Sequence, residues 1–428
     1  MVRLLSLFLL LSLFQLSPGS ASANSKKDSV SLNAGVPGVG EQPLSSNNIE
    51  ARFLTGLRDL ETGRPDKAIE AFSAILAADP TLIRVRLELA RAYFAAEQWN
   101  RARQEFFIVL SGDLPEPVRR RVLGFIRAID ARRGFDWDLS LGLTNTGGSR
   151  SYDSDTILLD FGGLTLPLTL DRNTESQLGI RATGAATYRL PIGLTSGDKV
   201  TSSLFVQGFF DITDAPNSTY DDYIAGVRTG LRFTGANTTY SVAPVYSQRY
   251  LAGEHYEDQA GVGLAFENRT GSGFSVFGTA SYSNVNNKFA EDRDGTLGQA
   301  QIGIRQSIGG TGAIGLSFFY EDKSVDFALE NYGLYGVRLL GVVDVPFGLT
   351  LRPSIFFEKK GFPEPSPLFT GNPDEESLGA RIRVEKNDLF IGNGFSPFFD
   401  VSHRRTKSGI EAFSYTETEY EFGLERRF

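Results

Sequence analysis

Only one short stretch of the chain gathers residue types that could hold a metal ion. Residues 253–258 (GEHYED) place His255 beside Glu254, Glu257 and Asp258, and imidazole and carboxylate groups are common metal ligands. The segments on both sides alternate between apolar and polar residues, as β-strands do. We therefore interpret this cluster as a solvated loop between two strands, and we predict no metal site.

Motifs for nucleotide binding and catalysis are equally weak. Residues 310–315 (GTGAIG) match the dinucleotide fingerprint, but that fingerprint needs a helix that begins inside it, and the residues that follow alternate as a strand. His403 is the only other histidine, and the absence of cysteine excludes disulfides, thiolate ligands and cysteine nucleophiles. We predict that the protein is not an enzyme and that it needs no cofactor.

The strand-like texture covers everything after Gly134. Residues 135–428 hold 37 of the 46 glycines and 40 of the 50 aromatic residues, so this part differs in kind from the part before it. About 14 alternating segments occur there, a spacing typical of strands of about 10 residues that cross a membrane. The segments are 137–146, 176–191, 199–214, 222–235, 237–252, 256–270, 273–288, 296–308, 312–326, 331–346, 349–361, 376–388, 395–407 and 415–428. Residues 156–170 contain a diglycine and a proline, and we assign them to a ribbon carried by a loop.

Alternation of this kind fits a soluble sandwich or a membrane barrel. In a sandwich the apolar faces pack together, whereas in a membrane barrel they meet lipid and the charged faces enclose a lumen. The chain ends with Tyr420, Phe422, Leu424 and Phe428 on one face, the pattern that the outer-membrane barrel assembly machinery reads, although Arg426 replaces an apolar residue. These features favour an antiparallel transmembrane β-barrel over residues 135–428.

Six charged residues occupy polar positions of the alternating segments and are the candidates to line the barrel lumen. They are Arg228, Arg232, Arg305, Arg381, Arg383 and Glu385. Two roles are open for them. They form a path or docking surface for a translocating partner, or they pair with acidic groups across the barrel and hold its wall rigid.

The part before Gly134 has helical spacing and an internal repeat. The same residue types recur 34 residues apart, as Ala68, Phe72 and Leu76 and then as Ala102, Phe106 and Leu110. A period of 34 is that of the tetratricopeptide repeat. We predict a tetratricopeptide-like helical domain over residues 49–134, with two units and a capping helix.

The inner helices of such repeats line a concave side. The predicted groove residues are Phe53, Leu57, Leu60, Arg84, Leu87, Arg91 and Phe94. A groove with aromatic and arginine side chains suits the capture of a peptide. The alternative is that some of these side chains pack on the capping helix or on the barrel mouth.

The N-terminus has the pattern of a secretory signal peptide. Residues 1–23 begin with a short basic stretch, continue with an apolar run and end in a small-residue cleavage site at Ala21 and Ala23. Residues 24–48 are polar and are expected to form a flexible leader. Residues 135–428 carry 25 basic and 37 acidic side chains, so nucleic acid is not an expected partner.

At this point the sequence resembles a known family, the surface lipoprotein assembly modifiers. Residues 80–145 carry most of the resemblance, with RLELARAYF, the second repeat and the strand WDLSLGLTN. The resemblance implies an outer-membrane protein whose repeats lie in the periplasm. It also implies a role in moving lipoproteins, or secreted binding proteins, to the cell surface, with capture by the repeats and passage through or along the barrel.

The full prediction is therefore an α + β chain of two domains, a short tetratricopeptide module followed by a barrel of about 14 strands. The expected partners are outer-membrane lipid, an exported lipoprotein or secreted protein, and the barrel assembly machinery through Phe428. The alternatives are a passive outer-membrane porin for small solutes and a secreted two-domain binding protein that never enters a membrane.

Overall fold

The computed structural model describes residues 46–427 apart from a few short gaps. The gaps are residues 111, 113, 133, 147–148, 173–175, 193–199, 310–311, 365–368, 370 and 392–394. The predicted signal peptide, nearly all of the predicted leader, and Phe428 lie outside the described residues.

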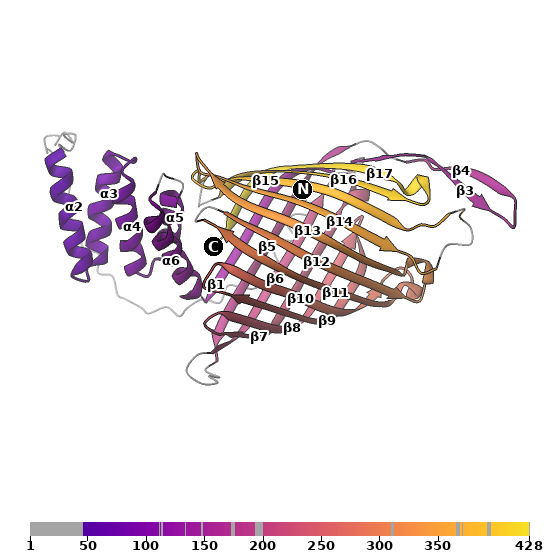
Figure 1. Ribbon diagram of the computed structural model, residues 1–428, viewed down its shortest axis with the longest axis horizontal. Helices are drawn as coiled ribbons and strands as arrows, with labels where there is room; N and C mark the ends of the chain where they lie inside the picture. Colours follow the sequence, from indigo (N-terminus) through magenta and orange to yellow (C-terminus); the bar gives the residue numbers. More distant parts are fainter. Residues whose placement is uncertain are drawn as a thin grey trace, which may run out of the picture. The chain divides into compact units, whose positions relative to one another are not determined.

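The described residues before Gly134 form a helical module. Its helices are α2 (Ser46–Glu61), α3 (Pro65–Ala78), α4 (Ile83–Ala95), α5 (Trp99–Leu110) and α6 (Glu116–Arg132) (Figure 1). Pro65 starts α3 at the one helical position where its missing N–H is no loss. No helix among the described residues is long and apolar enough to cross a bilayer.

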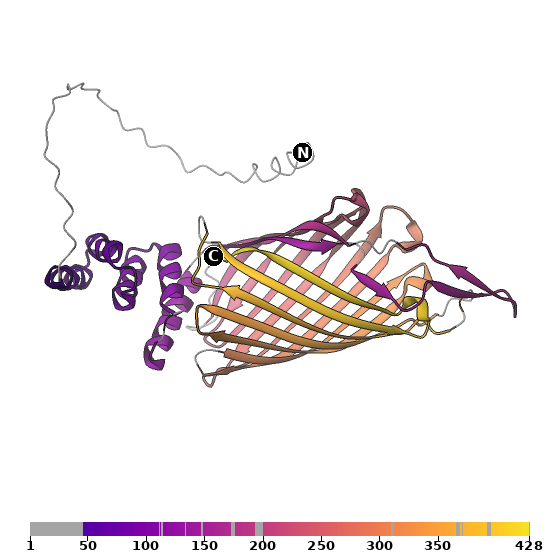
Figure 2. The same ribbon diagram turned by 90° about the horizontal axis from the view of Figure 1, so that it is seen from above.

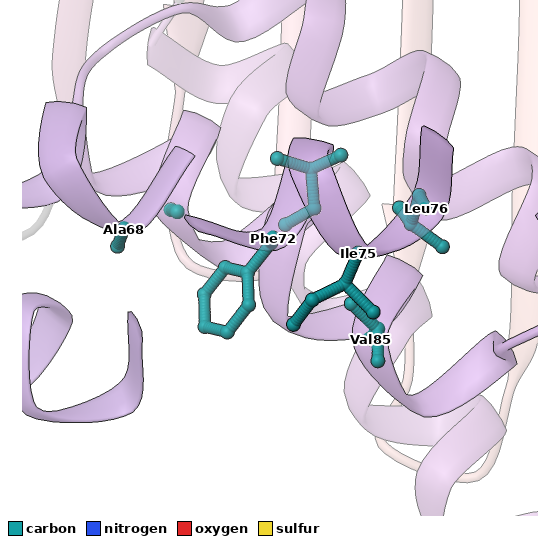
Figure 3. Close-up of a cluster of buried hydrophobic side chains, with 7 residues drawn as sticks. Ala68, Phe72, Ile75, Leu76 and Val85 are labelled. Carbon is teal, nitrogen blue, oxygen red and sulfur yellow. The ribbon is translucent and has the colours of Figure 1, made fainter. Parts of the chain in front are cut away.

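The 34-residue repeat builds two similar cores in this module. Phe72 is fully buried in the first core beside Val85 (Figure 3), and its ring lies against Gly56, where an added Cβ would come within 2.7 Å of the ring. Phe106 is fully buried in the second core together with Ala90, the residue that corresponds to Gly56. In each unit a small residue of the inner helix therefore makes room for an aromatic ring of the outer helix.

The residues after Gly134 form a closed antiparallel barrel of 14 long strands, which confirms the predicted fold class (Figure 1). The strands are β1 (Phe135–Thr146), β5 (Gln177–Pro191), β6 (Thr201–Asp214), β7 (Asp222–Thr234), β8 (Thr238–Leu251), β9 (Glu254–Arg269), β10 (Phe274–Asn287), β11 (Gly295–Ile308), β12 (Gly312–Val325), β13 (Tyr332–Val345), β14 (Leu349–Gly361), β15 (Glu375–Lys386), β16 (Ser396–Ser408) and β17 (Tyr415–Arg427). Each long strand pairs with the next, and β1 pairs with β17 to close the barrel.

Three short strands lie between β1 and β5. β2 (Arg150–Tyr152) pairs with β17, and β3 (Thr156–Asp160) pairs with β4 (Thr165–Thr169) as a separate hairpin, which is the predicted ribbon. Figure 2 shows the barrel from above, with β1 beginning and β17 ending at the same rim. We call this the terminal rim and the opposite end, which carries the β3–β4 hairpin, the far rim.

The outside of the barrel is apolar. Many outward positions of the long strands carry a large aliphatic or aromatic side chain that is exposed, for example Leu178, Leu264, Ile302, Phe318, Ile355, Leu378 and Phe422. Several exposed tyrosines lie in the halves of the strands nearer the far rim, where Tyr320 lies directly opposite Tyr335, and Tyr188 and Tyr240 lie nearer the terminal rim. An apolar band with aromatic residues near its edge is the outer surface of a barrel that spans a membrane.

Arg426 stands on this outer face near the terminal rim, where the sequence pattern calls for an apolar residue. Its guanidinium lies 4.7 Å from the centre of the Trp137 ring and 5.8 Å from that of Phe395. A cation over aromatic rings at the edge of a membrane keeps its alkyl stem in apolar surroundings and its charge near water. The departure from the pattern is therefore accommodated by its neighbours.

The buried ring of Phe72 makes a direct test of the repeat core. We expect Phe72→Ala to lower the free energy of unfolding of the helical module by roughly 3–5 kcal/mol, because it leaves a ring-sized cavity. Leu54→Ala is the control, since Leu54 is 58 % exposed, and should change it by less than about 0.5 kcal/mol. Urea denaturation followed by helical circular dichroism measures both, and equal losses would contradict the assigned core.

Candidate functional site

The six charged residues predicted for the lumen all lie on the inner face of the barrel. They alternate with outward apolar residues such as Val227, Ile304 and Ile382. Their surroundings differ. Arg381, Arg383 and Glu385 belong to an ion-pair network, and Arg228 and Arg305 stack on phenylalanine rings. Arg232 lies on β7 opposite Ser203 of β6 and Ser241 of β8.

Arg383 is the centre of the ion-pair network. Its guanidinium lies 3.3 Å from the carboxylate of Glu385 and 3.6 Å from that of Asp400, and it donates a hydrogen bond to Glu425. Its other contact is the ring of Phe398, 3.8 Å from the guanidinium carbon. Glu385 is only 1 % exposed, so this carboxylate depends on its basic partners for its charge.

Two further arginines complete the network. Arg352 of β14 donates to Glu385 at 2.8 Å, and Arg381 of β15 donates to Asp400 at 2.6 Å. Three guanidinium groups thus meet three carboxylates, and the network joins four consecutive strands, β14 to β17. The structure thus shows the pairing with acidic groups that the second of the two predicted roles requires, and the bracing of the wall stays a prediction.

Arg228, Arg305 and a third arginine, Arg338, follow a recurring arrangement that the sequence analysis did not anticipate. A phenylalanine ring covers a glycine of the neighbouring strand, and an arginine two residues after that glycine lies over the same ring at 5.2–5.3 Å. The three sets are Gly226, Phe209 and Arg228; Gly303, Phe277 and Arg305; and Gly336, Phe319 and Arg338. The signal in the sequence is the repeated Gly-Val-Arg or Gly-Ile-Arg, which would also have found Arg338.

These rings need the glycines. An added Cβ at Gly226, Gly303 or Gly336 would lie 2.4–2.5 Å from the ring that covers it, so no side chain fits there without movement. None of the three arginines forms an ion pair with another described residue. Stacking leaves their charge available to the lumen, in contrast to the neutral network around Arg383.

A cavity of about 930 Å³ occupies the lumen beside these groups. Its wall includes Arg305, Arg381 and Arg383, and β1 and β17 contribute residues such as Ser140 and Glu421. The lining carries both signs of charge. Such a surface is suited to a hydrated polar chain.

The predicted groove residues of the repeats divide into two groups. Phe53, Leu57 and Leu60 are half-buried against the first core, and Leu87 and Phe94 are half-buried against the second. These five apolar side chains therefore contribute to the packing of the module itself, with only part of their surface left for a partner.

The two arginines of the predicted groove are exposed. Arg84 of α4 lies over the ring of Phe53 of α2 at 5.3 Å, so the inner helices of the two units meet at this point. Arg91 pairs with Glu88 of its own helix at 2.6 Å. The exposed part of this surface is thus basic with one acidic neighbour.

The interpretation of residues 253–258 as a loop is wrong. The turn consists of Ala252 and Gly253, both with positive φ, and β9 begins at Glu254, so His255 and Asp258 lie on a strand. His255 hydrogen-bonds Asp258 at 2.9 Å and stacks on the ring of Tyr250. A turn of two residues is enough to reverse the chain here, whereas the sequence analysis predicted a longer loop between the two strands.

The described residues hold no group of three or more histidine, aspartate or glutamate side chains placed to bind a metal ion. The glycine-rich stretch at 310–315 leads directly into β12, which begins at Gly312, and its first two residues lie outside the described part. A strand in this position cannot present a helix N-terminus to a pyrophosphate.

The closed barrel with an apolar outside and a charged inside, preceded by helical repeats, defines an outer-membrane β-barrel protein with a tetratricopeptide module. A profile of the surface lipoprotein assembly modifiers matches residues 213–428, and a profile of the tetratricopeptide repeat matches residues 59–110. The chain belongs to the surface lipoprotein assembly modifier family.

Two curated relatives are similar over most of the chain. The surface lipoprotein assembly modifier of Moraxella catarrhalis is 23% identical over 367 residues, which cover 85% of this chain and 70% of the relative. Surface lipoprotein assembly modifier 1 of Neisseria meningitidis serogroup B is 22% identical over 380 residues, 86% of this chain and 73% of the relative. Among solved structures, a loop-deletion mutant of the outer membrane protein OmpT of Vibrio cholerae matches 69% of this chain and 100% of its own, with a TM-score of 0.36 and 13% identity.

The network around Arg383 predicts a stability effect. Arg383→Met removes the shared partner of three nearly buried carboxylates, so we expect the free energy of unfolding of the barrel to fall by about 3 kcal/mol. Arg228→Met removes a stacked arginine instead and should cost about 1 kcal/mol or less. Urea unfolding of the detergent-solubilised barrel compares them, and an equal or smaller loss for Arg383→Met would refute a bracing role.

Proposed function

We propose that this protein assists the delivery of lipoproteins to the cell surface from the outer membrane. The observation that carries the proposal is the family match over residues 213–428, which cover most of the barrel. The names of the two relatives describe the same role, and a hydrated lumen with mixed charge is compatible with a polar polypeptide. The role needs no chemical step, which agrees with the expectation that the protein is not an enzyme.

The repeats have the position in the chain that a capture module needs. α6 ends at Arg132 and β1 begins at Phe135, so the module is joined to the terminal rim. Several connections at this rim are short, for example 235–237 and 346–348, whereas longer ones such as 147–176 lie at the far rim. Short turns face the periplasm in outer-membrane barrels, which supports a periplasmic module that holds cargo before it reaches the barrel.

Of the predicted groove residues, Arg84 and Arg91 are the ones exposed to a cargo chain, because the apolar members are partly used in packing. We propose that they bind acidic or carbonyl-rich segments of the exported protein. The C-terminal Phe428 keeps its proposed role as a signal for the barrel assembly machinery.

Loss of the gene should leave a lipoprotein inside the cell, where it cannot reach the surface. We expect a candidate lipoprotein encoded nearby to become protected from protease added to intact cells, while its total amount stays the same. A passive porin predicts the opposite pattern, with reduced uptake of small solutes and unchanged protease sensitivity. That pattern would overturn the proposed function.

The capture step has a charge-reversal test. We expect Arg84→Glu with Arg91→Glu to lower surface delivery at least fivefold, because the change reverses the charge of the exposed inner-helix surface. Lys67→Glu with Arg101→Glu makes the same charge change on the outer helices α3 and α5 and should leave delivery within about twofold. Protease accessibility of the cargo reports delivery, and immunoblots confirm equal barrel levels. Equal effects of the two pairs would argue against capture by the inner helices.

A further inference from the structure

The barrel is closed by its shortest pairing. β1 and β17 pair over residues 138–144 and 421–427, seven residue pairs. The other neighbouring long strands are joined by between 11 and 14 pairs. Because the backbone hydrogen bonds of a ladder add along its length, this seam is the place where separating two strands breaks the fewest of them.

The middle of the seam has two glycines on its inner face, and the side chain of Glu421 covers one of them, Gly142. Gly142 lies directly opposite Gly423. An added Cβ at Gly423 would lie 2.2 Å from the carbonyl oxygen of Leu141, so the two backbones approach too closely for any larger residue. Cross-strand side-chain contacts stabilise a sheet, and this pair provides none.

Beyond Thr144 a side chain replaces the ladder. The Nδ2 of Asn145 donates to the carbonyl oxygen of Thr418 at 2.9 Å, and its Oδ1 accepts from the N–H of Tyr420 at 2.7 Å. Nearer the far rim, β17 pairs with the three-residue strand β2, where Arg150 forms an ion pair with Glu417 at 2.8 Å. The seam is therefore closed in three pieces, one short ladder, one asparagine and one short strand.

The seam also separates two different environments. On the inside, Ser140 of β1 and Glu425 of β17 border the luminal cavity. On the outside, Leu143 lies opposite Phe422, and both are exposed on the apolar surface. Only this seam stands between the cavity and the surrounding lipid at that point of the wall.

We propose that the β1–β17 seam opens laterally, so that the lipid anchor of a cargo lipoprotein passes between these strands while its polypeptide occupies the luminal cavity. This inference rests on the proposed function. An acyl chain drawn through a charged, hydrated lumen would expose its methylene groups to water, which is unfavourable. Passage through the wall keeps the acyl chain in hydrocarbon and the polar chain in water. The freed backbone groups line the opened gap, where water from the cavity or the cargo backbone satisfies them.

A disulfide across the seam tests the proposal, and the natural chain contains no cysteine that would interfere. Leu143→Cys with Phe422→Cys places two thiols on directly opposite outward positions of β1 and β17. Oxidation should lower surface delivery of the cargo at least tenfold, and reduction should restore it. Ile302→Cys with Phe318→Cys is the matched control, since these exposed residues lie directly opposite each other on β11 and β12, and its oxidation should leave delivery unchanged.

The outcomes separate the seam from the proposed function. The lateral opening is overturned if the seam disulfide forms and delivery continues, or if both disulfides block delivery equally. In either case, retention of cargo inside cells that lack the gene still upholds the delivery role. If deletion strands no cargo, the delivery role itself fails.

A second measurement does not depend on any cargo. Amide hydrogen exchange of the purified barrel should be at least tenfold faster in the paired residues of β1 and β17 than in those of β11 and β12. Asn145→Ala should raise the exchange at the seam further, because it removes both side-chain hydrogen bonds. Equal protection of the two ladders would overturn the proposal.

Discussion

The ladder between β1 and β17 is the interaction on which the rest of the barrel depends. A strand that crosses a bilayer must satisfy its N–H and C=O groups within the protein, because hydrocarbon offers no partner. Thirteen of the fourteen junctions join strands that follow one another in the chain, and only this one joins the two ends. Its closure turns an alternating sheet into an inside and an outside.

Closing the barrel confines the charged face of the sheet to a narrow lumen, so the charged side chains need partners there. On one side of the wall, arginines and carboxylates neutralise each other around Arg383, and the nearly buried Glu385 illustrates how far these groups are removed from water. Elsewhere, arginines such as Arg228 lie over phenylalanine rings that fill the space above glycines. The first arrangement is expected to stiffen the wall, and the second keeps positive charge at the surface of the lumen.

The sequence predicted the strands closely because their pattern is local. The segment predicted at 349–361 coincides with β14, and the hairpin at 156–170 was recognised from its diglycine and proline. The 34-residue spacing likewise predicted that Phe72 and Phe106 would fill equivalent cores. The two-residue turn before His255 was missed, because the alternation of β8 and β9 continues on both sides of a break too short to interrupt it.

What the sequence by itself determined is which side chains share a face and which helices repeat, because these depend on neighbours within a few residues. The tertiary structure alone decided which residues meet across strands. Asn145 and Thr418 are joined by a hydrogen bond although the rest of the barrel separates them in the chain, and nothing near either residue marks the other. The three carboxylates around Arg383 come from three strands in the same way. Register and closure follow from the sum of all the strand pairings, so they become definite only when the whole sheet has formed.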